Sequence, residues 1–503
     1  MINFRWEIMK HNIYFEALKP YLEKTRRLHY LTNVLYYDIA TSSPSKTIAD
    51  ESDMLAYYDS QSASFAQETS FKSLVKRGLE EDNLTNYEKA LFLALEQEIA
   101  LMEKMSLNDY SSMKKAFNKS NEMWRIYRPK DDFASWLPYW EECVKWARIE
   151  AKAMMKDGMK TPYDALLDHY EAGETVDYLD SLFTPIKKAI MKLLPIAISK
   201  EAAHPTPKIK PYSVGSQVKL SYDLLNLIHY DLEGGCLRTS AHPFSADLSR
   251  FDARLTTKYN VNDYRSNMFT ILHEGGHCLQ FQNKSEEEYE FFVESLASAA
   301  NCETHSRFYE NLIGRSEEFA PILKKLVSKD LDPGFAYMSD DDFYRSINKV
   351  EPGLIRTEAD ELTYTLHIII RYEIERDLIN EKIECKDVPA IWKEKYKAYL
   401  GVDVPNDKDG CMQDIHWTDA EFGYFPSYAL GNIYGAMIRE KMSEEIGLLD
   451  LIREGRMAEI LSWFKDNDFA YDYLPPRVWI KKVTGKEASP TAFINYLNAK
   501  FGK

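Results

Sequence analysis

Residues 252–281 read DARLTTKYNVNDYRSNMFTILHEGGHCLQF, a strand-like run that passes almost directly into a helix-like run. β-Branched residues stand at the centre of residues 252–260, which makes this run the best strand candidate in the chain. Residues 263–281 carry apolar residues at helical spacing, and Asn262 or Asp263 can cap that helix. The sequence therefore predicts a short strand that leads into a helix with one buried side.

The pattern HEGGH within this predicted helix indicates a metal site. His273 and His277 stand four positions apart, so a helix places both imidazoles on one face, one turn apart, where they can bind one ion. Glu274 then lies beside the ion without binding it. This HExxH arrangement is that of zinc metallopeptidases. Gly275 and Gly276 each cost about 1 kcal/mol relative to alanine, but they allow a neighbouring backbone or a substrate to come close.

A third ligand is needed, because catalytic zinc takes three protein ligands and keeps one position open for water. The five-residue pattern also turns up by chance in long chains, so it does not establish a metal site alone. Several carboxylates follow it, and a second helix that returns antiparallel would bring either Glu294 or Glu303 near the ion. Helical periodicity does not choose between the two.

The composition disfavours several classes of partner. The 503 residues are 45% hydrophobic, and 63 Lys and Arg stand against 79 Asp and Glu, a net charge of −16. This charge opposes binding to nucleic acid and to anionic membrane surfaces. Six scattered cysteines without a CxxC pattern are typical of reduced thiols in a cytoplasmic protein. The first residues lack the apolar core of a signal peptide, and no apolar run suits a membrane span.

Helical patterns dominate the rest of the chain. Residues 83–105 show one apolar stripe, and Thr85 with Glu88 gives a capping-box signature at its start. Similar patterns occur near residues 11–35, 137–158, 175–201, 216–231, 263–281, 290–313, 358–381 and 426–446. Strand-like runs are few, so the predicted fold class is mainly α.

A proline-rich segment divides the predicted helices. Residues 204–216 read HPTPKIKPYSVGS, and their three prolines lack backbone donors and disfavour helix. We therefore expect residues 1–203 to form an N-terminal helical half and residues 204–503 to form a catalytic helical half that shares a core with it.

Three further segments resemble a known family. Residues 294–314, ESLASAANCETHSRFYENLIG, are similar to the HES box and the WExxxG box of the carboxypeptidase Taq family of metallocarboxypeptidases. IRTEAD at 355–360 resembles the IRxxAD box of that family, and GCMQDIHW at 410–417 resembles its GxxQDxHW box. Two positions differ, since Cys302 stands where the family has histidine and Tyr309 where it has tryptophan.

The resemblance implies a complete ligand set. It places the ligand glutamate of the family on Glu303 and not on Glu294. With His273 and His277, this glutamate would hold Zn²⁺ or Co²⁺, both of which accept two nitrogens and a carboxylate. The metal would activate water, and Glu274 would take the water proton and pass it to the leaving amine. The cysteine beside the third ligand either alters metal affinity or pH dependence or, being small, only packs.

The resemblance also implies groups that stabilise the tetrahedral intermediate. His416 and the tyrosines of FGYFPSY, Tyr424 and Tyr428, are candidates, and the spacing of twelve residues between His416 and Tyr428 favours the latter. Taken without the family, an aromatic cluster of this kind would more often belong to the core or to an interface.

A carboxypeptidase must read the free C-terminal carboxylate, and a guanidinium does so with two parallel hydrogen bonds. Arg356 of IRTEAD is the first candidate for this role or for closing the groove, and Gln413 is grouped with it on the substrate side. The alternative for Arg356 is a structural ion pair with Glu358 or Asp360. Asp360 and Gln413 are also candidates to orient the ligand histidines.

The sequence thus predicts a cytoplasmic, zinc-dependent carboxypeptidase acting on peptides with a free C-terminus. The resemblance further implies a large helical fold with a deep substrate groove, a small antiparallel sheet beside the metal, and a homodimer. An oligopeptidase or dipeptidyl carboxypeptidase of related fold is one alternative. A non-catalytic, peptide-binding relative is another, against which the joint presence of the HExxH residues and Glu303 argues.

Overall fold

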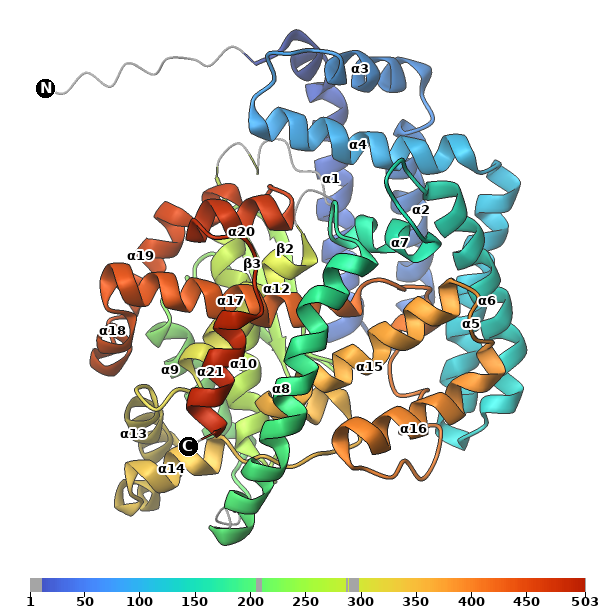
Figure 1. Cartoon of the computed structure of the whole chain (residues 1–503). Coiled ribbons are helices and arrows are strands. Elements are labelled where there is room, and N and C mark those ends of the chain that lie inside the picture. The colour runs from blue at the N-terminus through green and yellow to red at the C-terminus, as the bar shows by residue number, and fades with distance from the viewer. Residues whose placement is uncertain (1–10, 205–209, 286–287, 289–297, 503) are drawn as a thin grey trace, which may run out of the picture. The chain divides into compact units, whose positions relative to one another are not determined.

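The structure is a computed structural model that describes residues 11–204, 210–285, 288 and 298–502 (Figure 1). The contacts within the chain divide it into two compact units, Met1–Lys104 with Ser285–Leu296 and Met105–Lys284 with Ala297–Lys503. In the described part of the chain, no helix is long and apolar enough to cross a membrane. The proline-rich segment lies partly outside the described residues, and the expected division there stays a prediction.

The first unit consists of helices. They are α1 Ile13–Thr41, α2 Ile48–Phe65, α3 Thr69–Leu79 and α4 Asn86–Lys104. The capping box predicted at the start of α4 is confirmed, because Thr85 N donates to Glu88 Oε2 over 2.8 Å and Glu88 N donates to Thr85 Oγ1 over 3.1 Å. Glu88 also accepts a hydrogen bond from Asn12 N at 2.9 Å, which ties the start of α1 to the start of α4.

Helices also make up most of the second unit, as the sequence predicts. They are α5 Leu107–Tyr127, α6 Phe133–Met154, α7 Pro162–Tyr170, α8 Val176–Ala203, α9 Val214–Leu227, α10 Tyr264–Phe281, α12 Ala299–Arg307, α13 Ala320–Asp330, α14 Asp340–Ile347, α15 Glu361–Ile379, α16 Val388–Leu400, α17 Phe425–Ile446, α18 Leu448–Glu454, α19 Met457–Asn467, α20 Pro476–Thr484 and α21 Thr491–Phe501. A π-helical turn, Phe308–Ile313, continues α12. The start of the helix predicted near 290–313 lies outside the described residues.

Three short strands form a sheet against α10. They are β1 Leu237–Thr239, β2 Ser245–Ser249 and β3 Asp252–Thr257, in the order β1-β3-β2. The predicted strand is β3, and it leads into α10 as expected.

The sheet is mixed, so the expectation that it is antiparallel is wrong for one of its two pairings. β2 pairs antiparallel with β3, whereas β1 pairs parallel with it. The cause is the connection 240–244, which crosses the end of β3 and reverses the chain, so that β1 runs in the direction of β3. Phe244 N fixes this crossing by donating to Thr256 Oγ1 over 2.8 Å.

Helix α12 packs against both α10 and α17 through glycines. A Cβ at Gly276 of α10 would lie 2.7 Å from His305 O, and a Cβ at Gly431 of α17 would lie 2.8 Å from the Cβ of Glu303. Neither position has room for a side chain, so helix backbones come into close contact. The glycines of HEGGH are expected to let a backbone or a substrate come close. This is confirmed for Gly276, which the backbone of α12 approaches.

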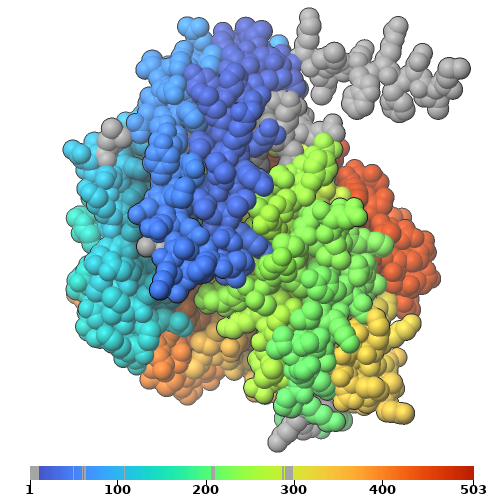
Figure 2. All heavy atoms as spheres, turned by 180° about the vertical axis from the view of Figure 1, so that it is seen from behind, coloured from blue at the N-terminus to red at the C-terminus, as the bar shows by residue number. Residues whose placement is uncertain are grey.

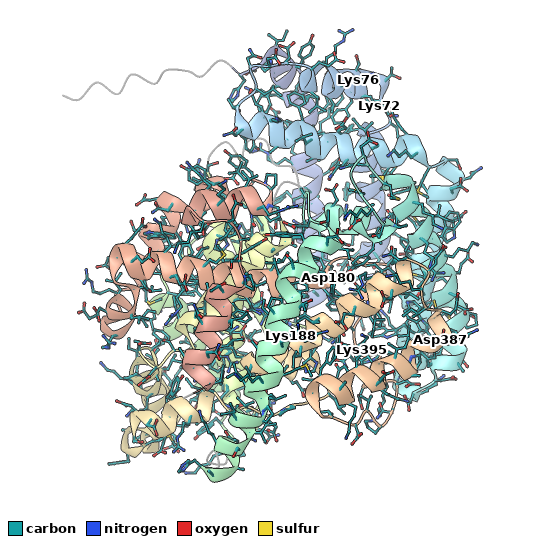
Figure 3. The ribbon with its side chains drawn as sticks, viewed as in Figure 1. Lys72, Lys76, Asp180, Lys188, Asp387 and Lys395 are labelled. Carbon is teal, nitrogen blue, oxygen red and sulfur yellow. The ribbon has the colours of Figure 1, made fainter. Side chains whose placement is uncertain are left out.

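Ion pairs link neighbouring helices at the surface of the second unit. Asp180 of α8, labelled in Figure 3, accepts hydrogen bonds from Tyr372 and Arg376 of α15 at 3.0 Å each. In the reverse view, α9 and α13 lie side by side (Figure 2), and Lys329 of α13 pairs with Asp223 of α9. Exposed pairs contribute about 0–1 kcal/mol each, so apolar burial accounts for most of this packing.

Candidate metal centre and active site

Helix α10 positions the two histidines of the HEGGH pattern. Asp263 is its N-cap and accepts a hydrogen bond from Arg265 N at 3.0 Å, one of the two caps that the sequence allows. Ile271 and its apolar neighbours are fully buried and fix one side of the helix. His273 and His277 lie on another face, with their ring centroids 5.1 Å apart.

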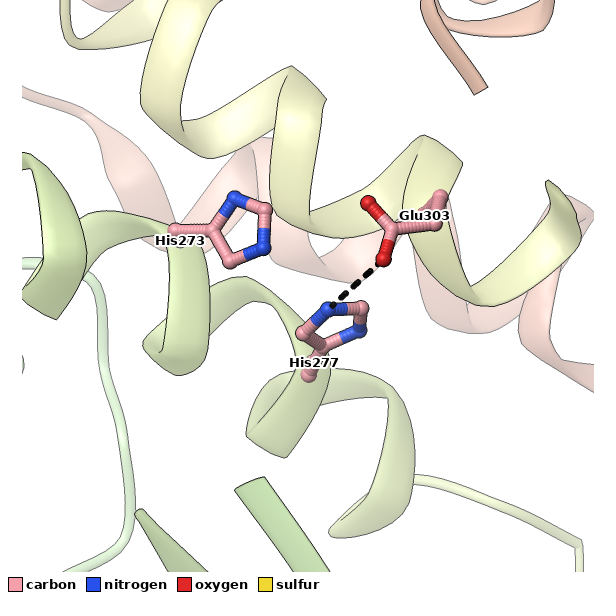
Figure 4. Close-up of side chains that lie close together, drawn as sticks. All are labelled: His273, His277 and Glu303. Atoms are coloured by element: carbon pink, nitrogen blue, oxygen red, sulfur yellow. Dashed lines mark ion pairs between the residues drawn. The ribbon is translucent and has the colours of Figure 1, made fainter. Parts of the chain in front are cut away.

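Three side chains converge at this face. The ligand atoms of His273, His277 and Glu303 all lie within 4.8 Å of one another (Figure 4). Nε2 of His277 is 3.9 Å from Oε1 of Glu303, which is too long for a hydrogen bond and near the separation of two ligands on one ion. Glu294, the other carboxylate that the sequence allows, lies outside the described residues.

Glu310 fixes the orientation of His273. Its Oε2 is 2.9 Å from His273 Nδ1, which leaves Nε2 of that ring for a metal. Arg307 and Arg315 pair with the same carboxylate at 3.2 and 3.5 Å. Burial alone would raise the pKa of Glu310, but Arg307 and His273 lower it to about 2, so this carboxylate is ionised at neutral pH.

The donor set fits a divalent metal such as zinc. Two imidazole nitrogens and one carboxylate oxygen are the three-ligand pattern of catalytic zinc. Burial, more than any neighbouring charge, holds the pKa of His277 well below its usual value, so its ring is neutral and has a lone pair to offer. The side chains of His273, His277 and Glu303 are 18, 13 and 7% exposed, which leaves the site open enough to admit a ligand.

Glu274, the expected general base, is held by Ser245 at the start of β2. The Ser245 hydroxyl lies 2.6 Å from Oε2 of Glu274 and 3.0 Å from its backbone oxygen. This contact fixes one carboxylate oxygen and leaves Oε1 for proton transfer. Burial raises the pKa of Glu274 above its ordinary value, which suits a group that must accept a proton.

Cys302 stands directly before the third ligand on α12. Burial raises the pKa of its thiol to about 12, so the side chain is uncharged at neutral pH. It therefore adds no charge beside Glu303, which favours a packing role for this residue.

His416 and the two tyrosines form a second cluster. His416 Nε2 is 3.3 Å from Tyr428 Oη, and the Tyr424 ring centroid lies 5.6 Å from that of His416 and 5.2 Å from that of Tyr428. Burial lowers the pKa of His416 to about 3, so its imidazole is neutral. Arg307 links this cluster to the metal centre, because its Nε lies 3.6 Å from Glu303 and its guanidinium 6.0 Å from the Tyr428 ring centroid.

Arg356 is buried and paired, but with another partner than expected. Its Nε donates to Asp414 Oδ1 over 2.9 Å, and its Nη1 donates to Tyr364 Oη over 3.2 Å. The expected alternative, an ion pair with Glu358 or Asp360, is wrong for the described residues. Asp360 instead caps α15, where it accepts a hydrogen bond from the backbone of the third residue beyond it.

Gln413 supports Arg356 and Arg371 from within the protein. Its Oε1 accepts hydrogen bonds from Arg356 N and Arg371 Nη2 at 2.9 Å each, and its Nε2 donates to Leu354 O over 3.0 Å. The expectation that Gln413 or Asp360 orients a ligand histidine is wrong within the described residues, where Glu310 does this for His273. The oxygen and the nitrogen of the Gln413 amide are both already hydrogen-bonded within the protein. This favours a role for Gln413 in supporting Arg356 over direct contact with the substrate.

The chain as a whole is similar to known proteins. A family model described as carboxypeptidase Taq (M32) metallopeptidase matches residues 17–501. The chain belongs to the carboxypeptidase Taq family. One relative in sequence is carboxypeptidase 1 of Bacillus subtilis (strain 168), 33% identical over 491 residues, which are 96% of this chain and 97% of that protein. Another is thermostable carboxypeptidase 1 of Thermus thermophilus, 34% identical over 425 residues, or 81% of each chain.

Solved structures of carboxypeptidases have a similar fold. Metallocarboxypeptidase 1 of Trypanosoma cruzi aligns with a TM-score of 0.92 at 30% identity, over 97% of this chain and 99% of that one. The predicted family and the predicted mainly helical fold are therefore confirmed, and the chain is a metallocarboxypeptidase by family.

Sequence reasoning missed three residues of the candidate site. Glu310 and Asp414 stand within the recognised boxes, as the glutamate of YENLIG and the aspartate of QDIHW, so the boxes were a signal for both. Ser245 had no such signal, since a tertiary contact between β2 and α10 brings it to Glu274.

Proposed function

We propose that this member of the carboxypeptidase Taq family is a zinc-dependent enzyme that removes single residues from the free C-termini of peptides. The observation that carries the proposal is the convergence of His273, His277 and Glu303 within 4.8 Å, beside the expected base Glu274. The relatives named above are carboxypeptidases, which supports cleavage from the same end of the substrate.

A divalent metal bound by these three residues would polarise the peptide carbonyl and make water nucleophilic at neutral pH. Glu310 holds the His273 ring so that Nε2 faces that position. Glu274 accepts the proton of the attacking water at Oε1, since Ser245 occupies Oε2, and then delivers it to the leaving amine. Its raised pKa favours the first transfer.

His416 and Tyr428 stabilise the negative charge that develops on the carbonyl oxygen. His416 is neutral and donates from one ring nitrogen, and burial raises the pKa of Tyr428, which keeps the phenol protonated. Donors already fixed in place stabilise a transition state better than donors that must reorient. Tyr424 packs against both rings and supports their orientation.

Arg356 is the candidate reader of the C-terminal carboxylate. Its guanidinium lies 5.1 Å from the Tyr428 ring centroid and therefore borders the oxyanion donors. Asp414 and Tyr364 use its Nε and Nη1, whereas among the described residues no hydrogen bond uses its Nη2. Arg356 thus offers a substrate one charge-assisted hydrogen bond, and Gln413 holds its backbone in place.

The proposal also includes the metal that is bound, the cytoplasmic location and the assembly into a homodimer. Zn²⁺ is the resident metal, and Co²⁺, which accepts the same donors, replaces it with activity. The six cysteines are free thiols, which suits a cytoplasmic protein. A homodimer is expected from the resemblance. Metal analysis of protein purified without added metal, with native mass spectrometry, tests both the ion and the dimer.

Peptide mass spectrometry tests the reaction itself. A mixed peptide pool is incubated with the protein, with and without a chelator. A ladder that shortens by one residue from the C-terminus and disappears with the chelator supports the proposal. Losses of two residues at a time would indicate a dipeptidyl carboxypeptidase, and internal cuts an oligopeptidase.

A second comparison tests the reading of the carboxylate. The same peptide is offered as the free acid and as the C-terminal amide. Slower cleavage of the amide supports recognition by Arg356, whereas equal rates contradict it. Binding of peptides without any cleavage would identify a non-catalytic relative.

A further inference from the structure

Residues 416–424, the 416–424 loop, carry two groups of the proposed active site, His416 at one end and Tyr424 at the other. The loop backbone adopts positive φ at two positions, 62° at Ala420 and 97° at Gly423. Positive φ at a non-glycine residue costs on the order of 1 kcal/mol. The loop therefore needs contacts from outside to hold this conformation.

Glu375 of α15 supplies such contacts at both ends of the loop. It is fully buried, and its Oε1 accepts a hydrogen bond from Trp417 Nε1 over 2.6 Å. Its Oε2 accepts one from Gly423 N over 3.0 Å and another from Tyr163 Oη over 2.7 Å. The two loop contacts fall directly after the histidine of the loop and directly before its tyrosine, so a single carboxylate joins its ends.

Helix α7 packs under the same loop. A Cβ at Gly423 would lie 2.7 Å from Leu166 O, so the loop rests on the backbone of α7. Tyr170 of α7 packs edge-on against Tyr424, with ring centroids 5.2 Å apart. Tyr163 belongs to this helix too, and its bond to Glu375 therefore connects α7, α15 and the loop at one carboxylate.

We propose that Glu375 is a positioning residue for His416 and Tyr424 in peptide hydrolysis. It acts through the hydrogen bonds that fix Trp417 and Gly423. The inference rests on the proposed function, in which the donors of this cluster stabilise the oxyanion. Donors of that kind must be held within a fraction of an ångström to be effective.

All three partners of Glu375 are hydrogen-bond donors in these contacts. The indole Nε1–H of Trp417 and the backbone N–H of Gly423 have no lone pair to offer. An amide in place of the carboxylate would turn its NH₂ group toward a donor, so Glu375→Gln disturbs the loop while it keeps the size of the side chain.

Glu373 provides a matched control on the same helix. It is a buried carboxylate with three partners, Lys187 at 2.6 Å, Lys395 at 2.5 Å and Tyr399 at 2.8 Å. Lys395, labelled in Figure 3, lies on α16, and the described partners of Glu373 do not belong to the 416–424 loop. Glu373→Gln therefore replaces a buried carboxylate of the same helix by an amide without touching that loop.

The experiment compares the wild-type protein, Glu375→Gln and Glu373→Gln. Metal content, kcat, KM and the inhibition constant of a phosphinic peptide, which mimics the tetrahedral anion, are measured for each. We expect Glu375→Gln to keep its metal and its KM and to lose about 10- to 100-fold in kcat, because donors are displaced. The phosphinic inhibitor should weaken by the same factor as kcat/KM, while Glu373→Gln loses thermal stability and keeps its kcat.

Several outcomes overturn the inference. They are an unchanged kcat in Glu375→Gln, equal losses of kcat in both variants, and a loss of kcat explained by lost metal. If Glu375→Gln does not fold, Tyr163→Phe replaces it as the test, because this variant removes a single hydroxyl that bonds to Glu375. A lower kcat with metal retained supports the inference, and an unchanged kcat overturns it. A wild-type protein that fails to cleave peptides instead overturns the proposed function, so the two failures are distinguishable.

Discussion

Three glutamates near the metal centre differ in their chemistry because their partners differ. Glu303 faces two imidazoles, Glu310 lies among two guanidinium groups and an imidazole, and Glu274 is buried against a serine hydroxyl. In the proposed function, the same functional group therefore serves as a ligand, as the acceptor that orients a ligand, and as a base. Substitution of each should change a different measurable property.

Glu274→Gln should retain the metal and lose nearly all turnover. The three ligands survive in this variant, whereas an amide cannot accept the water proton, and a general base contributes about 10²- to 10⁴-fold. Metal content per chain and kcat on one peptide test the expectation together. Substantial residual activity would refute the assignment of the base.

Glu303→Ala should lose the metal outright, and Glu310→Gln should weaken its binding by about 10- to 100-fold, as loss of an orienting partner does. Competition with a chelator of known affinity measures both. Glu294→Ala is the control and should bind metal normally. A stronger loss in Glu294→Ala than in Glu303→Ala would make Glu294 the ligand.

Ser245→Ala should lower kcat by about tenfold with metal content unchanged, because a hydrogen bond to a charged group is lost from the base. Ser245→Thr keeps the hydroxyl and should restore most of the activity. Steady-state kinetics on one peptide compare the three proteins. Equal activity of alanine and threonine variants would show that the hydroxyl does not orient Glu274.

Among the helices and strands, those with a local signal could be predicted. The cap of α10, the capping box of α4 and strand β3 follow from neighbouring residues in the chain, and the structure has all three. The parallel pairing of β1 depends on how the connection 240–244 crosses β3, and the periodicity of apolar residues does not predict this crossing.

The candidate metal site shows the same limit. Two of its candidate ligands share one helix and follow from their spacing, whereas the third depends on where another helix returns. The spacing of residues did not decide whether Glu294 or Glu303 is the third ligand. It also gave no indication of Ser245, because the contact of Ser245 with Glu274 forms only when β2 packs against α10. The family boxes, and not periodicity, pointed to Glu303.

Gly431→Ala should disturb the helix that carries the third ligand. The added methyl would lie 2.8 Å from the Cβ of Glu303, so α12 must shift, at a cost of about 1–3 kcal/mol for overpacking. Gly435→Ala on the same helix is the control, since its methyl would lie 3.2 Å from the flexible end of Leu312 and at an ordinary contact distance of 3.8 Å from Thr304 O. Melting temperature and metal affinity should fall more in Gly431→Ala, and equal effects would contradict this.

In the molecule as a whole, these buried carboxyl groups fall into two sets, those whose pKa is raised and those whose pKa is lowered. Burial raises the pKa of Glu171 to about 7, of Glu174 to about 8 and of Glu375 to about 7. Despite burial, Arg307 lowers the pKa of Glu310, and Arg371 with Arg356 lowers that of Asp414. The two sets make the free energy of unfolding depend on pH in opposite directions.

These carboxyl groups should therefore stabilise the metal-free protein most near about pH 4 to 5, close to their ordinary pKa. Groups with a raised pKa stabilise the folded state below their ordinary pKa, and this contribution is lost as the pH rises from there through about 7 to 8. Groups with a lowered pKa stabilise it above their ordinary pKa and lose this contribution in acid. Each titrating group changes the stability by about 1.4 kcal/mol per pH unit between its two pKa values.

Urea unfolding midpoints from pH 4 to pH 9, on the order of one pH unit apart, test this dependence. Glu174→Gln should flatten the decline above about pH 5, because the amide cannot ionise. Stability that rises steadily from about pH 5 to pH 8 in the wild-type protein would contradict the expectation.

The glycine contacts of α12 also bear on how quickly the site can be filled. Gly276 and Gly431 hold the backbone of α12 around Glu303 against α10 and α17, so a movement of this backbone cannot carry Glu303 away from His277. The backbone that carries the candidate ligands is thus arranged before an ion arrives, and no refolding step need precede its capture. The rate of metal uptake should then depend on how fast the ion sheds its own hydration water.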